Sequence, residues 1–392
     1  MPFTADELDA ALDELDNDTA TGADDVPACI IKRISVPLKS QVLALINYSK
    51  AQCVLPPIWK LGLVTPLHKG GDATVGSNFR PVAVPPVLPR TMERMVLRRI
   101  ASTLLPHLPP QQSGFQRGRL MSESLLVLMH AATEALRASS FRPVAFLDLA
   151  KAYDSVWHDG LLFKLARLGL SVNDILWIKA LICDRSYRIR WNGVLSAAYS
   201  TTAGLGQGMV LACLLFIIFI YDLNEAVKGV AALQSADDLC IIPESLGAQG
   251  IPELQAAISE LSAYLARWRL TLSPAKSSIV VFKNNGLRVP AFTVSAGSVL
   301  IPQTNQVKYL GVVVDSSVSF TFHRNQQLAK AKRLAGIYDE MGAPQRHKRM
   351  GCPYRPVHHH CASDPAADVT VCVCVLAGWR HSNAEFAESL PR

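Results

Sequence analysis

Three acidic residues in apolar surroundings are the residues of this sequence best placed to do chemistry. Asp148 interrupts the apolar run at 144–149, and Asp237 with Asp238 interrupts the run at 231–242. An ionised carboxylate in an apolar strand is costly unless something pairs with it. If the two runs meet, the carboxylates could share Mg²⁺, which favours carboxylate oxygens together with water and phosphate.

Paired Mg²⁺ ions would give such a site a definite reaction. Two ions about 3.5–4 Å apart can activate an attacking 3′-hydroxyl and stabilise departing pyrophosphate. Phosphoryl transfer depends mainly on positioning and charge neutralisation. The alternative is that Asp237 and Asp238 simply occupy a hairpin turn, where Asp is favoured. Adjacent residues of a strand face opposite sides, so we expect unequal roles, with Asp237 the more direct ligand.

The elements that must position these carboxylates follow from hydrophobic periodicity. The segment 231–242 predicts two short strands around a tight turn at the two acidic residues. The helix at 91–105 carries Arg90, Arg94, Arg98 and Arg99 on or near its exposed side. We expect helices at residues 4–15, 28–50, 91–105, 161–170, 207–221, 252–269 and 323–341, and strands at 62–68, 144–149, 279–282 and 307–314.

The composition indicates a folded protein with a mildly basic surface. The chain has 392 residues, of which 49% are hydrophobic and 18% charged, and its net charge is +7. This balance excludes a disordered chain, and it is compatible with a phosphate-rich partner without requiring one. The apolar run at 209–221 is shorter than the roughly 20 residues that span a bilayer, so we expect a soluble protein. We also expect reduced cysteines and no signal peptide.

Longer blocks around the acidic residues resemble the reverse transcriptase domain of a non-LTR (LINE-type) retrotransposon. The blocks nearest the carboxylates are FLDLAKAYDSV at 146–156, GLGQG at 204–208 and ADDL at 236–239. The flanking blocks are TGADDVP at 21–27, NFRPV at 78–82, SGFQRGR at 113–119, LSPAKS at 272–277 and KYLG at 308–311. The resemblance covers about residues 4–341, and the order of the blocks makes it specific.

The resemblance implies an α/β (α+β) right-hand polymerase with fingers, an antiparallel-sheet palm and a partial thumb. We expect an N-terminal extension and fingers at 1–140, the palm at 141–316 and the partial thumb at 317–342. Helices would pack on one face of the palm sheet. The reaction would be RNA-directed DNA synthesis, with dNTPs added to a primer 3′-hydroxyl.

The resemblance also assigns roles to residues around the reacting groups. Asp148 and Asp237 would be catalytic metal ligands, with Asp238 a supporting carboxylate. Tyr153 would lie under the sugar of the incoming nucleotide and exclude a 2′-hydroxyl. The alternative for Tyr153 is core packing at a strand end.

Further nucleotide contacts are implied outside the carboxylate blocks. Gln207 and Gly208 would lie beside the nucleotide and template, where a small residue permits close backbone approach. Arg80 and Lys69 would contact the triphosphate, since basic groups hydrogen-bond phosphate. Lys276 would act near the leaving group. For these three basic residues the alternative is a solvated surface charge.

The implied partners are an RNA template, a DNA primer and dNTPs, without a membrane. Two Mg²⁺ ions would be the cofactors, with Mn²⁺ able to substitute. The helices at 91–105 and 323–341 are candidates for salt-sensitive contacts to the template backbone. The resemblance implies an intracellular ribonucleoprotein in the nucleus and cytoplasm, and the sequence leaves the oligomeric state open. A primer grip is implied at Tyr309, Leu310 and Gly311.

Departures from the family pattern keep two alternatives open. Ser235, Gly206 and Met209 replace residues common in the family, and Ala212-Cys213 replaces a serine-proline pair. None removes a carboxylate. The alternatives are a catalytically inactive nucleic-acid-binding remnant and an intron-encoded reverse transcriptase.

The segment 343–392 does not resemble the continuation of the family. It is rich in His and Cys, but the spacing is not the regular paired spacing of structural zinc sites. We expect an atypical, poorly ordered tail. No block resembles an endonuclease, so we expect a fragment or a truncated copy.

Overall fold

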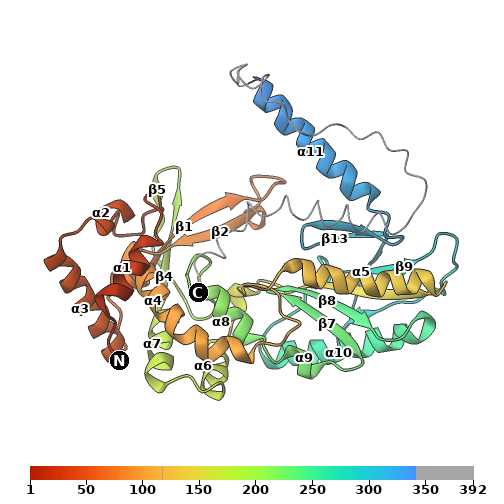
Figure 1. The fold of residues 1–392 in the computed structure, drawn as a ribbon, viewed down its shortest axis with the longest axis horizontal. Helices are drawn as coiled ribbons and strands as arrows, with labels where there is room; N and C mark the ends of the chain where they lie inside the picture. Colours follow the sequence, from red (N-terminus) through yellow and green to blue (C-terminus); the bar gives the residue numbers. More distant parts are fainter. Residues whose placement is uncertain (117, 341–392) are drawn as a thin grey trace.

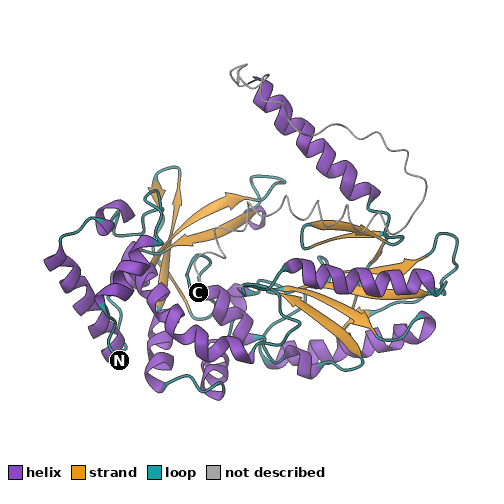
Figure 2. Ribbon diagram, viewed as in Figure 1, coloured by secondary structure: helices purple, strands orange, loops and turns teal. Residues whose placement is uncertain are grey.

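The computed structural model describes residues 1–116 and 118–340, which form two sheet-containing regions flanked by helices (Figures 1 and 2). The N-terminal region contains β1 and β2 beside β4, and the second region contains the sheet that carries the acidic residues. The mixed α/β fold expected from the sequence is confirmed.

The second region is built on a five-stranded sheet in the order β12-β9-β3-β8-β7. All neighbours are antiparallel except β12 and β9, which are parallel. Every residue of the central strand before Asp148 is buried, which explains why this strand reads as a continuous apolar run. The strands are β3 (Phe141–Asp148), β7 (Val230–Ser235), β8 (Asp238–Pro243), β9 (Ser278–Lys283) and β12 (Gln303–Thr304).

Helices cover both faces of this sheet, so the expectation of helices on one face was wrong. On one face α10 (Gly250–Arg267) packs with Leu147 and Leu239. On the other, α5 (Met121–Arg137) packs with Phe146 and Cys240. The physical reason is that β3 and β8 carry buried apolar side chains on both faces, so each face must be shielded from water.

The helices beside this sheet meet around one buried ammonium group. Lys164 is fully buried. Its Nζ donates to the Asp222 carboxylate at 2.5 Å and to the Tyr264 hydroxyl at 2.9 Å, and it lies 3.8 Å from the centre of the Trp268 ring. The contacts of Lys164 with Asp222 and Tyr264 join α6 (His158–Arg167) to the turn before α9 (Leu223–Ala226) and to α10. Helix α7 (Val172–Ile182) packs against α6.

The helix expected at 207–221 is shorter than predicted, because α8 spans only Ala212–Phe219. The preceding residues form a loop whose Leu211 N–H is bonded to the buried Glu93 carboxylate at 3.0 Å. Among the described residues, no helix is both long and apolar enough to cross a membrane.

The N-terminal helices begin with α1 (Ala5–Asp13), where the predicted capping box between Thr4 and Glu7 is present. The single helix expected at 28–50 is instead α2 (Ala28–Lys32) and α3 (Val36–Gln52). Pro37 lies in the first turn of α3, and proline is tolerated there but not within a continuous helix.

The arginines of α4 (Val87–Leu104) are not directed to solvent, which corrects the expectation of an exposed basic side. Arg98 pairs with Glu14 and Arg99 with Glu7, each at 2.6 Å. These pairs attach α4 to α1, so this part of the helix is engaged within the protein and not free for a template.

The N-terminal sheet contains β1 (Leu61–His68), β2 (Phe79–Val84), β4 (Arg185–Trp191), β5 (Val194–Leu195) and β6 (Tyr199–Thr201). β1 pairs antiparallel with β2 and parallel with β4. This arrangement projects the β1–β2 hairpin beside the second region (Figure 1). Five short 3₁₀ helices span Pro57–Lys60, Gly76–Asn78, Leu105–His107, Tyr153–Ser155 and Gly247–Gln249.

The strand expected at 307–314 is a hairpin of β13 (Gln306–Tyr309) and β14 (Val312–Asp315). Leu310 and Gly311 form its turn, with φ values of 46° and 83°. Two consecutive positive φ values are the geometry of a tight two-residue hairpin. A further small hairpin joins β10 (Ser295–Ala296) to β11 (Val299–Leu300).

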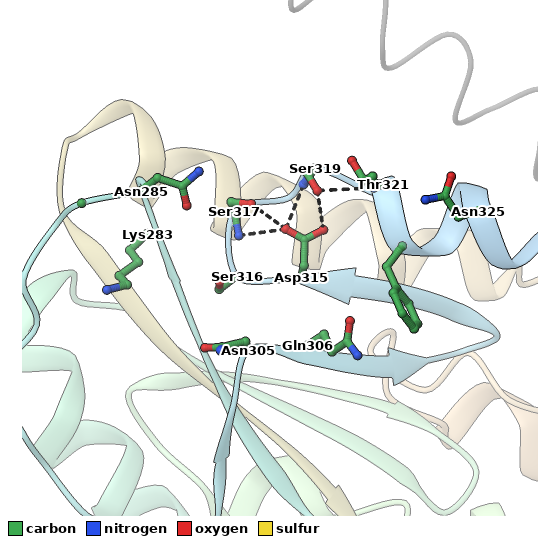
Figure 3. Close-up of a pocket in the computed structure, with 12 residues that line it drawn as sticks. Lys283, Asn285, Asn305, Gln306, Asp315, Ser316, Ser317, Ser319, Thr321 and Asn325 are labelled. Carbon is green, nitrogen blue, oxygen red and sulfur yellow. Dashed lines mark hydrogen bonds between the residues drawn. The ribbon is translucent and has the colours of Figure 1, made fainter.

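The last described helix, α11 (Thr321–Glu340), is joined to β14 by a serine-rich turn. The Asp315 carboxylate accepts hydrogen bonds from the backbone N–H groups of Ser317 and Ser319 (Figure 3). It also accepts one from the backbone N–H of Phe320. A pocket of about 560 Å³ lies beside this turn, and none of the predicted site residues lines it. The segment 343–392 lies outside the described residues.

Candidate active site

The three acidic residues meet at one end of the sheet. Asp148 and Asp238 are direct partners in the antiparallel ladder, so their side chains face the same side with Cα atoms about 5 Å apart. Ala236 and Asp237 form the two-residue turn between β7 and β8, which we call the acidic turn. Since consecutive Cα atoms are about 3.8 Å apart, the Cα atom of Asp237 lies within about 9 Å of the Cα atom of Asp148.

The Asp148 side chain is partly buried and incompletely satisfied. Its Oδ2 atom is buried without a hydrogen-bond partner. The Lys276 ammonium lies 3.3 Å from this oxygen, but it is 70% exposed. An exposed lysine stabilises a carboxylate only weakly, so Asp148 retains an oxygen that can bind a cation.

Burial and neighbouring carboxylates raise the pKa values of Asp237 and Asp238. Burial is the largest cause for the raised pKa of Asp237, and the charge of Asp148 adds to it, while Lys276 and Arg80 oppose the rise. Burial, then Asp237 and Asp148, raise the pKa of Asp238 to about 6. Although Asp238 is exposed by surface area, the neighbouring like charges support the same direction.

This donor set fits divalent magnesium, although the side chains do not form a ready-made cluster. Within residues 1–116 and 118–340, no group of three His, Cys, Asp or Glu side chains is arranged as a metal site. The available donors are nonetheless all oxygens, and one of them on Asp148 is buried with the exposed Lys276 ammonium as its ion-pair partner. Oxygen donors and mutually repelling carboxylates are the environment that a hard divalent cation stabilises.

Tyr153 lies beside the acidic residues with its ring held by packing. The ring stacks on Phe216, with centroids 4.7 Å apart and planes 24° apart. Its hydroxyl is buried beside the Cys213 thiol. Burial raises its pKa, and Cys213 and Asp237 add to that rise. The last effect places Tyr153 within electrostatic range of the acidic turn.

The loop that contains Gln207 and Gly208 connects the two sheets. The Gln207 carbonyl accepts the Ala83 N–H at 2.7 Å, and the Gln207 amide donates to Asp154 at 3.4 Å. Gly208 has φ +121°, and a Cβ there would meet the Ala83 oxygen at 1.9 Å. The close backbone approach expected at Gly208 is thus an approach to β2.

The two predicted phosphate-binding cations lie on the β1–β2 hairpin. Arg80 and Lys69 are exposed, and neither forms an ion pair with another described residue. Arg80 lowers the pKa of Asp237, so its guanidinium lies within electrostatic range of the acidic turn. Lys69 lies on the same hairpin, where its backbone N–H donates to the Asn78 carbonyl at 2.8 Å.

The predicted primer grip divides into a buried and an accessible part. Tyr309 is 3% exposed, and its ring packs on Phe146 at 5.3 Å between centroids. Phe146 is two residues from Asp148 on the same face of β3. Leu310 and Gly311 form the partly exposed turn beside it.

Two supporting residues escaped the sequence-based prediction. The Ser277 hydroxyl accepts the Asp148 N–H at 3.2 Å, and the buried Gln112 carboxamide accepts the Ala236 N–H at 3.1 Å. Ser277 ends a block that we had associated with Lys276, and Gln112 directly precedes the block at 113–119. Their proximity to those blocks is the only signal in the sequence.

The sequence matches a known family over most of the described chain. Residues 67–314 match the family described as reverse transcriptase (RNA-dependent DNA polymerase). The chain therefore belongs to the reverse transcriptase family.

The curated relatives show that its domain is of the non-LTR, LINE type. The probable RNA-directed DNA polymerase from transposon X-element of Drosophila melanogaster is 27% identical over 82% of this chain and 36% of the relative. The RNA-directed DNA polymerase from mobile element jockey of the same species is 29% identical over 80% of this chain and 35% of the relative. This chain spans about a third of the length of these relatives.

Among solved structures, apo telomerase from Candida tropicalis, truncated from its C-terminal domain, aligns with a TM-score of 0.44. The alignment has 12% identity and covers 69% of this chain and 57% of that one.

Proposed function

We propose that this protein is an RNA-directed DNA polymerase that adds dNTPs to a DNA primer 3′-hydroxyl along an RNA template. The supporting observation is the meeting of Asp148, Asp237 and Asp238 at the end of one sheet in a chain of the reverse transcriptase family. We assign β3 and β7–β9 to the palm, the β1–β2 hairpin to the fingers and α11 to a partial thumb.

Asp148 and Asp237 would hold two Mg²⁺ ions, or Mn²⁺ in their place, and Asp238 would support them. Bound ions would supply charge neutralisation at the triphosphate and activation of the primer hydroxyl. The buried Asp148 oxygen, which accepts no hydrogen bond and faces only the exposed Lys276 ammonium among the described ion pairs, supports this assignment. Cation binding would also relieve the like-charge repulsion that contributes to the raised pKa values of Asp237 and Asp238.

The remaining residues would bind and orient the nucleotide. Arg80 and Lys69 would hold the triphosphate from the hairpin, since Arg80 is electrostatically coupled to Asp237 and neither cation is paired. Lys276, beside Asp148, would lie near the leaving group. The Tyr153 ring, fixed against Phe216, would restrict the space at the sugar.

The same proposal implies the substrates and the cellular location of the protein. The substrates would be an RNA template, a DNA primer and dNTPs, with the turn at 310–311 contacting the primer. Family resemblance motivates placing the protein in an intracellular ribonucleoprotein of nucleus and cytoplasm.

A primer-extension assay on poly(rA)/oligo(dT) tests the proposal. We expect extension with dTTP that requires Mg²⁺ and stops on chelation. Template binding without extension under Mg²⁺ and Mn²⁺ would favour a catalytically inactive nucleic-acid-binding remnant. A measured salt dependence of binding would report phosphate contacts in either case.

A further inference from the structure

The segment 111–113 pairs with the edge strand that leads into the acidic turn. The Gln234 N–H donates to the Gln111 carbonyl at 3.0 Å, and the Ser113 N–H donates to the Gln234 carbonyl at 2.8 Å. β7 is the last strand of the sheet. Residues 111–113 therefore cover an edge that would otherwise present unpaired backbone groups.

The side chain of Gln112 reaches from this segment to the acidic turn. Its Oε1 atom accepts the Gly114 N–H at 2.9 Å and the Ala236 N–H at 3.1 Å. Gln112 is fully buried and Ala236 is 7% exposed. Because Ala236 has φ +57°, an unfavourable conformation for a non-glycine residue, surrounding contacts must hold it there.

Two further amides, the buried Gln234 and the half-buried Asn224, fix which end of Gln112 faces the turn. Gln112 Nε2 donates to Gln234 Oε1 at 3.3 Å, and Gln234 Nε2 donates to Asn224 Oδ1 at 2.5 Å. The chain of donors runs from Gln112 to α9, so the carbonyl end of Gln112 faces the acidic turn. A Cβ at Gly114 would lie 2.5 Å from the Ala236 nitrogen, so the backbone at Gly114 also contacts the acidic turn.

We propose that Gln112 is a positioning residue for nucleotide addition. Its side-chain carbonyl holds the Ala236 N–H, which fixes the acidic turn and orients the Asp237 carboxylate toward bound divalent cations. The catalytic consequence rests on the proposed polymerase function, whereas the hydrogen bond and its effect on the turn do not.

Gln112→Met tests the catalytic consequence, because methionine keeps most of the volume but cannot accept these hydrogen bonds. Gln255→Met is the matched control, since Gln255 bridges the N–H and carbonyl of Ser295 at 2.9 and 3.0 Å away from the site. We expect the Mg²⁺ concentration for half-maximal extension to rise on the order of tenfold in Gln112→Met only. Equal Mg²⁺ requirements in the two variants would overturn the proposal.

Hydrogen exchange of the Ala236 amide tests the contact without relying on activity. We expect protection in the wild-type protein and exchange at least about tenfold faster in Gln112→Met. Gln112→Glu keeps an acceptor oxygen and should retain protection. An unprotected Ala236 amide in the folded wild-type protein would refute the contact, even if Gln112→Met failed to fold.

The outcomes separate the two proposals. An inactive wild-type protein with a protected Ala236 amide would reject the polymerase function and leave the role of Gln112 in holding the turn intact. An active wild-type protein whose Gln112→Met variant loses protection but keeps the Mg²⁺ requirement would reject positioning.

Discussion

At the residue scale, the acidic site combines groups that are each unfavourable alone. Asp148 has a buried oxygen whose ion-pair partner is the exposed Lys276 ammonium, Asp238 has a pKa raised to about 6, and Tyr153 has a buried hydroxyl beside the Cys213 thiol. Buried polar groups usually have partners. Their gathering at one sheet end is better explained by a ligand-binding role than by stability.

Tyr153 provides the first prediction at this scale. Replacing it with alanine removes the ring from its stack on Phe216, so the space for a ribose 2′-hydroxyl should open. We expect ribonucleotide incorporation relative to deoxynucleotide to rise on the order of tenfold or more, measured from kcat/KM for each nucleotide. Tyr153→Phe keeps the ring and should preserve discrimination. Unchanged discrimination in Tyr153→Ala would remove the sugar-gate role.

The pKa of Asp238 gives a second prediction, for stability. A folded pKa of about 6 lies above the ordinary aspartate value of 3.8. As pH rises from about 4 to about 6, the unfolded state releases its proton first, so the folded state is progressively disfavoured without a cation. Mg²⁺ should offset this cost mainly where the carboxylates are ionised.

Thermal unfolding in Mg²⁺ and in chelator measures this effect. We expect Mg²⁺ to raise Tm more at about pH 7.5 than at about pH 4.5, and we expect Asp238→Asn to reduce that difference. An equal rise in Tm at both pH values would contradict the linkage.

At the element scale, the site depends on a close contact between the loop at 204–208 and β2. Gly208→Ala would place a Cβ 1.9 Å from the Ala83 oxygen at a φ that favours glycine. We expect a loss of about 2 kcal/mol or more in the free energy of unfolding, measured by urea denaturation. Gly76→Ala is the control, because nothing lies within 4 Å of its added Cβ. Equal stability of the two variants would show that the loop can move.

The sequence could predict the elements whose signals are local. The central strand was recognisable because one Asp interrupts an apolar run, and the hairpin at 231–242 because two acidic residues divide another. The turn at Leu310 was missed because leucine is not a usual turn residue and its flanks are β-prone. The break between α2 and α3 was missed although Pro37 marks it.

Contacts between distant segments could not be predicted in this way. The arginines of α4 appeared exposed because a sequence does not reveal that α1 supplies Glu7 and Glu14 as partners. Gln112 was missed because its acceptor role depends on Ala236, 124 positions away. The covering of both faces of β3 was missed because α10 lies far along the chain, although α5 directly precedes β3.

At the scale of the whole molecule, the loop at 204–208 links the β1–β2 hairpin to the segment after β3, because Gln207 bonds to Ala83 through its carbonyl and to Asp154 through its amide. Arg80 of the hairpin also lowers the pKa of Asp237 in the acidic turn. A polymerase needs such an arrangement, because the triphosphate must contact cations of one region and carboxylates of the other. The central claim is therefore that the three carboxylates act together in nucleotide addition.

The rate of single-nucleotide incorporation in matched aspartate-to-asparagine variants tests this claim most directly. With Mg²⁺, we expect Asp148→Asn and Asp237→Asn to lose on the order of a thousandfold in rate, and Asp238→Asn to lose less. Asp159→Asn, an exposed control on α6, should keep the wild-type rate. Incorporation by the wild-type protein that persists undiminished in Asp148→Asn or Asp237→Asn would contradict the account.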